Sequence, residues 1–179
     1  MSHEIVESLV SAGIFDGFTW IRCEGKGSFR SSPVLKRFGE SRVGAGEKTL
    51  VVDLDGCTGM DSTFMGTLAG LANLLAKKGS GVLQVVGTDE RNRRSLEDLG
   101  LDLLVDIEPE QAVWRGRIDE VRKGLAPVDG GEFPASNEDR ARHVFDAHKT
   151  LADTSEENKK RFRGVLEVLE DELEKNKGS

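Results

Sequence analysis

The chain has 179 residues, of which 37% are hydrophobic and 32% charged, so it has the size and composition of one globular domain with an appendage. The formal net charge is −7, and the basic residues are scattered or lie next to acids. Because nucleic acids and anionic membranes bind clustered positive surfaces, we expect neither as a partner. The two cysteines are too few for a disulfide scaffold, and no apolar stretch reaches membrane-spanning length. These features indicate a cytoplasmic protein.

The first part of the chain carries one helical and two strand patterns. Residues 2–11 place apolar side chains on one helical face, which predicts a short amphipathic helix within an N-terminal segment, residues 1–16. Residues 18–24 alternate and are rich in β-formers, so they predict a first strand. The run at 49–54 is apolar on both faces, as expected for a central, fully buried strand.

The next part of the chain alternates regularly between helices and strands. The predicted elements are a helix over 62–78, a strand at 82–86, a helix from Asp89 to Gly100, a strand at 103–107 and a helix over 114–125. Such alternation predicts an α/β domain, residues 17–124, in which a mixed and partly parallel sheet is flanked by helices.

The last part of the chain predicts a helical extension. Residues 125–136 contain two prolines and two glycines and are typical of a linker. Residues 137–179 carry two amphipathic patterns, the second opened by the capping-box sequence Thr154-x-x-Glu157, and predict an antiparallel helical hairpin. The apolar stripes of the hairpin need a covering surface, which could be the domain itself or a second copy in a homodimer.

The most informative stretch is VVDLDGCTGMDSTFMG, residues 51–66. The strand is followed by a glycine-containing turn and then by Asp61-Ser62-Thr63, where the next helix begins. Free N–H groups and the helix dipole favour anions at such a position. Since Asp and Ser are also common N-caps, a purely structural cap is the simplest interpretation of these residues taken alone.

The element order and this motif resemble the STAS domain family, which includes anti-sigma-factor antagonists. The matching residues are Val51-Val52-Asp53-Leu54, Met60-Asp61-Ser62-Thr63, Gly66, Leu83-x-Val85-Val86-Gly87 and Leu99-Gly100-Leu101-Asp102.

The resemblance implies a STAS-like mixed sheet and a role in binding proteins rather than in catalysis. In the family, the serine that follows the aspartate is phosphorylated by a partner kinase that also acts as an anti-sigma factor. Ser62 is the matching position, and Thr63 is a secondary acceptor. The implied docking residues are Asp61, Ser62, Thr63 and Phe64. Phe64 departs from the family, which usually has glycine there, and it could fill a groove or present itself to the partner.

A rival hypothesis starts from Asp53-Leu54-Asp55-Gly56. This sequence resembles the opening motif of haloacid-dehalogenase-like phosphatases, in which the first aspartate is the nucleophile and a Mg²⁺ ion is required. Cys57 stands where that family has Thr or Val, and no later acidic pair follows a strand to bind the metal. A third hypothesis is a STAS scaffold that is not phosphorylated.

No metal site or cofactor is expected from the histidines. His3, His143 and His148 have no metal-ligand spacing with cysteines or acids. His143 and His148 are five residues apart on one predicted helix, so they point in different directions, and we expect both to be solvated or half-packed.

Overall fold

The computed structural model describes residues 9–130 and 136–177. The strands are β1 (Leu9–Phe15), β2 (Phe18–Gly27), β3 (Thr49–Asp53), β4 (Cys57–Met60), β5 (Val82–Val86), β6 (Asp106–Ile107) and β7 (Ala126–Pro127). The helices are α1 (Ser32–Gly44), α2 (Ser62–Lys77), α3 (Glu90–Asp98), α4 (Ile118–Lys123), α5 (Asn137–Thr154) and α6 (Glu156–Lys177). Within those two ranges, no helix has the length and apolar character needed to cross a membrane.

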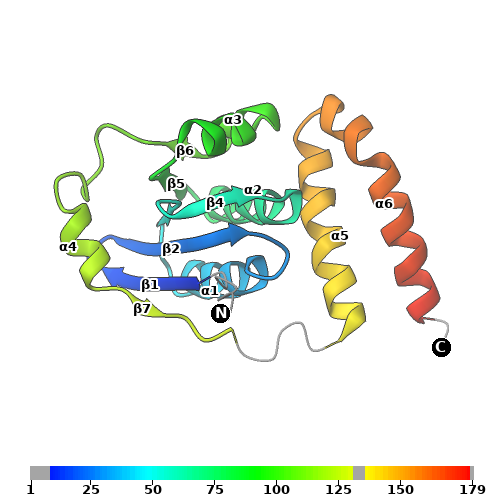
Figure 1. The fold of residues 1–179 in the computed structure, drawn as a ribbon, viewed down its shortest axis with the longest axis horizontal. Helices are drawn as coiled ribbons and strands as arrows, with labels where there is room; N and C mark the ends of the chain where they lie inside the picture. Colours follow the sequence, from blue (N-terminus) through cyan, green and yellow to red (C-terminus); the bar gives the residue numbers. More distant parts are fainter. Residues whose placement is uncertain (1–8, 131–135, 178–179) are drawn as a thin grey trace, which may run out of the picture.

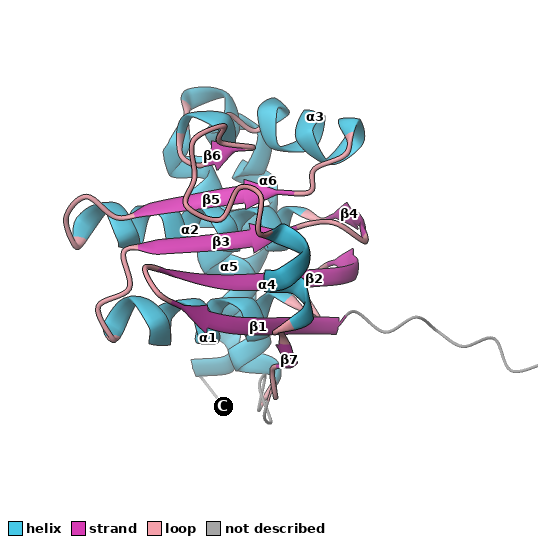
Figure 2. Ribbon diagram, turned by 90° about the vertical axis from the view of Figure 1, so that its left-hand side faces the viewer, coloured by secondary structure: helices cyan, strands magenta, loops and turns pink. Residues whose placement is uncertain are grey.

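The sheet is mixed, as predicted, with the strand order β6-β5-β3-β2-β1-β7 (Figures 1 and 2). The pairs of β2 with β3, β3 with β5 and β5 with β6 are parallel, while β1 is antiparallel to both β2 and β7. The short strand β4 pairs with the far end of β2, beyond the end of β3. This pairing carries the chain along β2 to the point where α2 begins.

Helices cover both faces of the sheet. The larger apolar core joins the strands to α1, α2 and α3 on one face. On the other face, a smaller cluster lies under α4 and consists of Phe18, Trp20, Val51, Val86, Trp114 and Val121. The central position of β3 was predicted correctly, since every residue from Leu50 to Asp53 is buried.

The N-terminal prediction was wrong for the residues of that segment that the structure describes. Residues 9–15 form β1, which pairs along its whole length with β2, and residues 1–8 lie outside the described residues. The apolar pair Leu9 and Val10 fits a helix face, but an isolated short helix is only marginally stable in water. The same residues form backbone hydrogen bonds by pairing with β2. The sheet therefore begins before residue 17, inside the segment that was expected to be a separate helical element.

Several boundaries after residue 100 also differ from those predicted. The expected strand at 103–107 is shortened to β6 because a 3-10 turn occupies Leu101–Leu103. The helix expected over 114–125 is only α4, and Trp114 precedes it. The linker expected at 125–136 contributes β7 to the sheet, so the domain extends past residue 124. The break between α5 and α6 is at Ser155. This residue, not Thr154, caps α6 by accepting a hydrogen bond from the backbone N–H of Asn158 at 3.0 Å.

The C-terminal hairpin, α5 with α6, packs on its own domain. α5 lies across α2 on the side of the helices that faces away from the sheet, and α6 packs on α5 (Figure 1). Leu151 and Phe162 from the hairpin join the main core. The start of α6 is also tied to the end of α3, because the Asn158 side chain donates a hydrogen bond to the Leu99 carbonyl at 3.0 Å. The hairpin thus covers the core, one of the two arrangements that the sequence left open.

Candidate functional site

Asp61 fixes the start of α2. Its carboxylate accepts hydrogen bonds from the backbone N–H groups of Phe64 at 2.8 Å and Phe29 at 2.9 Å. Its own N–H donates to the Gly27 carbonyl at 2.8 Å. Asp61 is therefore an N-cap that also joins α2 to the turn after β2. With both carboxylate oxygens engaged, it holds the position of the next residue, Ser62.

Ser62 is the first residue of α2 and is half-buried. Its Oγ lies 2.8 Å from Nε2 of His148 on α5. The Nδ1 atom of the same ring lies 2.7 Å from the Val144 carbonyl oxygen, which can only accept a hydrogen bond. We therefore assign a proton to Nδ1, and in this tautomer Nε2 accepts a hydrogen bond from the Ser62 hydroxyl. The predicted phosphorylation site is closed by a residue of the hairpin.

The two residues after Ser62 point into the protein. Thr63 is 5% exposed and Phe64 is fully buried, so neither contributes to an outer surface. The Phe64 ring lies over Gly27, where an added Cβ would stand 3.0 Å from the ring. Of the two roles considered for Phe64, the structure has the first: the ring fills the space that a glycine on β2 provides, and it is not exposed to a partner. Of the four implied docking residues, only Asp61 and Ser62 are partly exposed.

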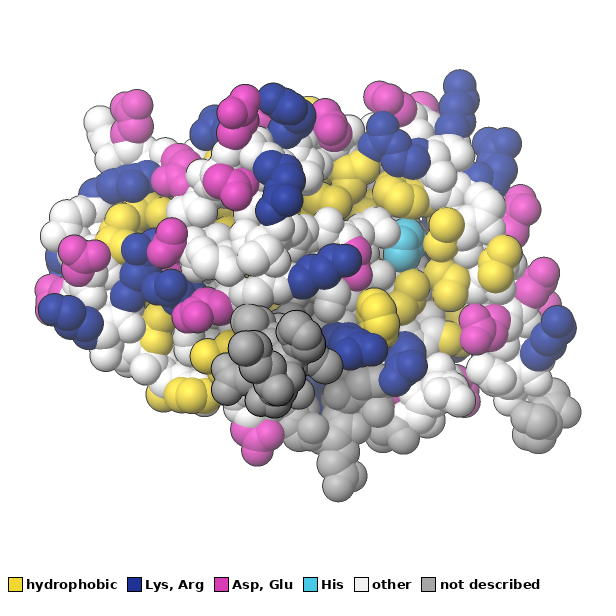
Figure 3. Space-filling model, in the orientation of Figure 1, with side chains coloured by type: hydrophobic (Ala, Val, Ile, Leu, Met, Phe, Trp, Pro, Cys, Tyr) yellow, Lys and Arg dark blue, Asp and Glu magenta, His cyan; other side chains and the backbone are white. Residues whose placement is uncertain are grey.

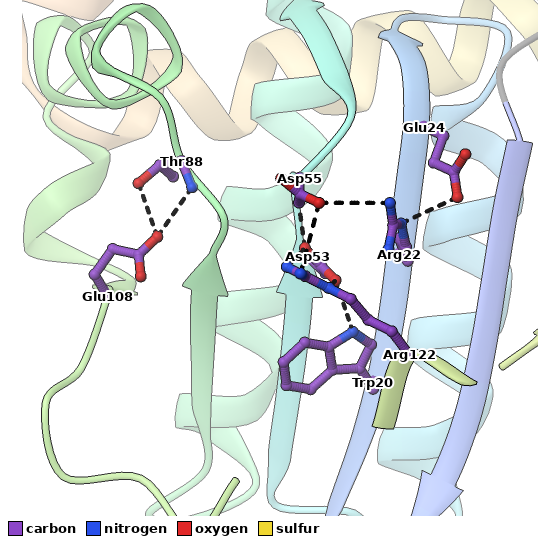
Figure 4. Close-up of polar contacts among 8 residues, drawn as sticks. All are labelled: Trp20, Arg22, Glu24, Asp53, Asp55, Thr88, Glu108 and Arg122. Atoms are coloured by element: carbon purple, nitrogen blue, oxygen red, sulfur yellow. Dashed lines mark hydrogen bonds and ion pairs between the residues drawn. The ribbon is translucent and has the colours of Figure 1, made fainter. Parts of the chain in front are cut away.

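Asp53, the nucleophile of the rival hypothesis, is enclosed in a hydrogen-bond network (Figure 4). Its Oδ2 accepts from Trp20 Nε1 at 3.0 Å and from Arg122 Nε at 2.8 Å. Its Oδ1 accepts from the Asp55 backbone N–H at 3.0 Å and from Arg122 Nη2 at 3.1 Å. The carboxylate is fully buried and each oxygen takes two donors, so it presents no free lone pair to a substrate.

This network joins α4 to the end of β3. The hydrogen bond and charge of Asp53 raise the pKa of the Arg122 guanidinium, which binds the carboxylate in bidentate fashion. Gly87, at φ +73°, comes so close to Asp53 and Asp55 that a Cβ there would overlap the Asp55 backbone nitrogen. Asp55 points outward and forms ion pairs with Arg22 and Arg122 at 3.5 and 3.6 Å. The Asp-x-Asp-Gly sequence thus serves the packing of a strand end.

The other polar residues near this edge form no metal site. Thr88, which follows β5, donates through both its N–H and its Oγ1 to one carboxylate oxygen of Glu108, at 2.9 and 3.1 Å (Figure 4). Among the described residues, no group of three or more His, Cys, Asp or Glu side chains could hold a metal ion.

The two histidines of α5 were predicted wrongly as solvated or half-packed. Both are buried, and each makes a hydrogen bond to a serine in the first turn of a domain helix. His143 Nε2 lies 2.8 Å from Oγ of Ser32 at the start of α1, which repeats the arrangement of His148 and Ser62. Burial, together with the positive charge of Lys36, lowers the pKa of His143 to about 4. One feature of the sequence could have indicated that this face of the helix is buried, namely its small residues Ala141, Ala147 and Ala152.

The sequence profile of the STAS domain matches residues 10–112. The chain belongs to the STAS domain family. The matched region runs from β1 to the segment before α4, and so includes the Asp61–Ser62 site but not the hairpin. No curated protein matches the chain.

Solved structures of two other proteins share the fold at low sequence identity. A candidate anti-sigma factor antagonist from Thermotoga maritima aligns with a TM-score of 0.52 at 19% identity, over 62% of this chain and 92% of that chain. An anti-sigma factor antagonist from Mycobacterium paratuberculosis aligns with a TM-score of 0.51 at 23% identity, over 68% of this chain and 97% of that chain. Those proteins are matched almost from end to end, whereas a large part of this chain lies outside either alignment.

Proposed function

We propose that this STAS domain is a cytoplasmic regulatory module that binds an anti-sigma factor with serine kinase activity and is switched by phosphorylation of Ser62. One observation carries the proposal: in a STAS fold, Ser62 holds the first position of α2, directly after an aspartate that caps the helix. The fold likeness to antagonists from two organisms supports the same role.

The position of Ser62 suits a switch that changes docking without unfolding the domain. A phosphate adds about −1.5 to −2 charges at pH 7. The N-terminal end of α2 tolerates that charge because its dipole and free N–H groups favour anions. The added charge therefore acts on the partner, since an acidic or apolar patch that meets unmodified Ser62 is repelled by the phosphoserine.

The proposed role needs no cofactor and no catalysis by this chain. The Asp53 carboxylate accepts four hydrogen bonds, two of them from Arg122, so it holds α4 against the sheet rather than attacking a phosphate. Purified protein assayed with p-nitrophenyl phosphate and Mg²⁺ is expected to show no turnover. Hydrolysis that disappears in the Asp53→Asn variant would instead support the phosphatase hypothesis.

The first test is phosphorylation by each purified anti-sigma-type serine kinase of the source organism, with the modified residue mapped by mass spectrometry. We expect phosphate on Ser62, and its loss in Ser62→Ala. Ser32→Ala is the matched control, because Ser32 also opens a helix and is also bonded to a histidine of α5. Phosphate on Thr63 in place of Ser62, or none with any of the kinases, would count against the proposal.

The second test compares partner affinity for four forms of the protein by calorimetry. Ser62→Ala should bind at least as well as unmodified protein, because removing one hydroxyl changes little at the interface with the partner. Phosphorylated protein should bind much more weakly, and Ser62→Asp should fall between them because it carries a single charge. Equal affinity of all four forms would leave Ser62 as an ordinary helix-cap residue.

A further inference from the structure

The hairpin occupies the surface on which the proposed partner would have to dock. α5 crosses the N-terminal halves of the domain helices, and two of its histidines bond to the first residues of α1 and α2, at 2.8 Å in each case. His148 also packs edge-on against Phe162 of α6, with ring centroids 5.4 Å apart. Ser62 is therefore partly covered by α5, through His148 and the Phe162 ring that packs behind it.

At Gly66, the approach of α5 to α2 leaves no space for a second molecule. A Cβ placed on Gly66 would overlap the carbonyl oxygen of Ala147, so the two helix backbones are in direct contact one turn after Ser62. Four residues further on, Gly70 faces open space. A partner cannot reach the turn of α2 between Ser62 and Gly66 while α5 is in place.

The same interface has the features of a contact that can open. Its buried groups include polar side chains, His143, His148 and Asn158, rather than aliphatic ones alone. An open groove of about 390 Å³ separates parts of α5 from α1 and α2, and charged residues such as Lys36 and Asp146 line it. Leu151 and Phe162 join the hairpin to the main core, and the polar contacts beside them separate more readily than apolar contacts would. In Figure 3, hydrophobic side chains surround the visible edge of a histidine over the hairpin.

We infer that the α5–α6 hairpin is an internal cover of the Ser62 site, and that α5 must leave α2 before a partner protein can dock or a kinase can phosphorylate the serine. This inference rests on the proposed function. The hairpin acts as a competitor tethered to the domain, and it lowers the apparent affinity for the partner by the fraction of molecules in which it is open.

The test measures access to position 62 without any partner. Ser62→Cys supplies a thiol, and its modification by a polyethylene-glycol maleimide, a reagent with protein-like bulk, reports how often the site is uncovered. Protein lacking this substitution corrects for Cys23 and Cys57, which are buried. The additional change Gly66→Ala should push α5 away. The matched control is Gly70→Ala, which adds the same methyl group to the same helix where nothing opposes it.

We expect Gly66→Ala to raise the modification rate at least about tenfold, the factor that corresponds to about 1.4 kcal/mol of docking free energy, and Gly70→Ala to leave it unchanged. Amide hydrogen exchange in α5 and α6 should rise in the same variant. Leu151→Asp, which puts a charge at a fully buried hairpin position, serves as a second way to release the hairpin. If exchange rises in neither variant, or if it rises while access to position 62 stays constant, the hairpin is not a cover.

The kinase assay then separates this inference from the function on which it rests. With the native Ser62, the variant that releases the hairpin should be phosphorylated faster than wild type and Gly70→Ala. If Ser62 is phosphorylated at the same rate with the hairpin released and with it closed, the hairpin is not a cover, and the proposed function is unaffected. No phosphorylation and no partner binding even with the hairpin released rejects the proposed function, and the cover with it.

Discussion

The Asp53 network and the Ser62–His148 pair both join distant parts of the chain through polar contacts, yet different elements of the protein surround them. Asp53 is surrounded by elements of the sheet domain itself and by α4, with four donors on one fully buried carboxylate. Ser62 makes one hydrogen bond to a helix that lies outside the family match. A fully satisfied network rigidifies a fold, whereas a single bond to an appendage can break while the domain stays folded.

The largest effect should come from Asp53→Asn. Arg122 would keep its charge but lose its bidentate carboxylate, and Trp20 would face an altered acceptor, so we expect a loss of roughly 3 kcal/mol of unfolding free energy. Asp55→Asn is the control, since its side chain is 54% exposed, and it should cost less than about 1 kcal/mol. Urea unfolding midpoints measure both. Equal, small shifts would mean that the network does not hold α4 to β3.

Acid should weaken the packing of the hairpin on the domain by protonating His143. Its pKa is about 4 in the folded protein against 6.5 when free, so protonation favours the released or unfolded state. The stabilisation is complete above pH 6.5 and is lost as the pH falls toward 4, by about 3 kcal/mol in total. Lys36 on α1 opposes protonation of the ring, and Asp61 before α2 favours it.

The pH effect is checked by unfolding or hairpin exchange measured from pH 7 to pH 4, with His143→Gln as the control. Glutamine stays neutral and can still bond to the Ser32 hydroxyl, so the variant should lose less stability in this range than wild type. Parallel curves for the two proteins would show that other groups, not His143, cause the acid sensitivity.

A smaller effect should distinguish the two serine–histidine pairs. Ser32 is fully buried, and its replacement by alanine leaves His143 without that partner in the interior, so we expect a cost of about 1–2 kcal/mol. Ser62 is half-buried, so water can replace its hydroxyl on His148, and Ser62→Ala should cost about 0.5–1 kcal/mol. Thermal or urea unfolding gives both values. A larger cost at position 62 would contradict the view that this pair is the more easily opened one.

Local signals allowed much of the fold to be predicted. The buried strand β3, the start of α2 at Ser62 and the Asp89 cap of α3 each depend on residues close in sequence, and the structure confirms them. β1 was missed because its conformation is determined by pairing with β2 rather than by its own apolar spacing. The N-cap role of Asp61 was expected from its position, and its second contact to Phe29 was not.

The parts of the candidate site that escaped prediction depend on contacts between residues far apart in the sequence. The pairing of Ser62 with His148 spans 86 residues, and that of Ser32 with His143 spans 111. Phe64 occupies the space above Gly27 of β2, so its burial cannot be predicted from the sequence of α2 alone. Helix periodicity indicated that α5 has an apolar face, but it did not say which surface that face covers.

The two ends of the strand order have a consequence for how the protein meets other chains. Both outer strands, β6 and β7, are two residues long, and β7 includes Pro127, which has no N–H to donate. Short outer strands with proline offer an incoming strand almost no ladder of free backbone groups, which protects against aggregation by sheet extension. Assembly with a second copy, which remains a prediction, would then use helical surfaces such as α6, where Val165 and Val168 are exposed.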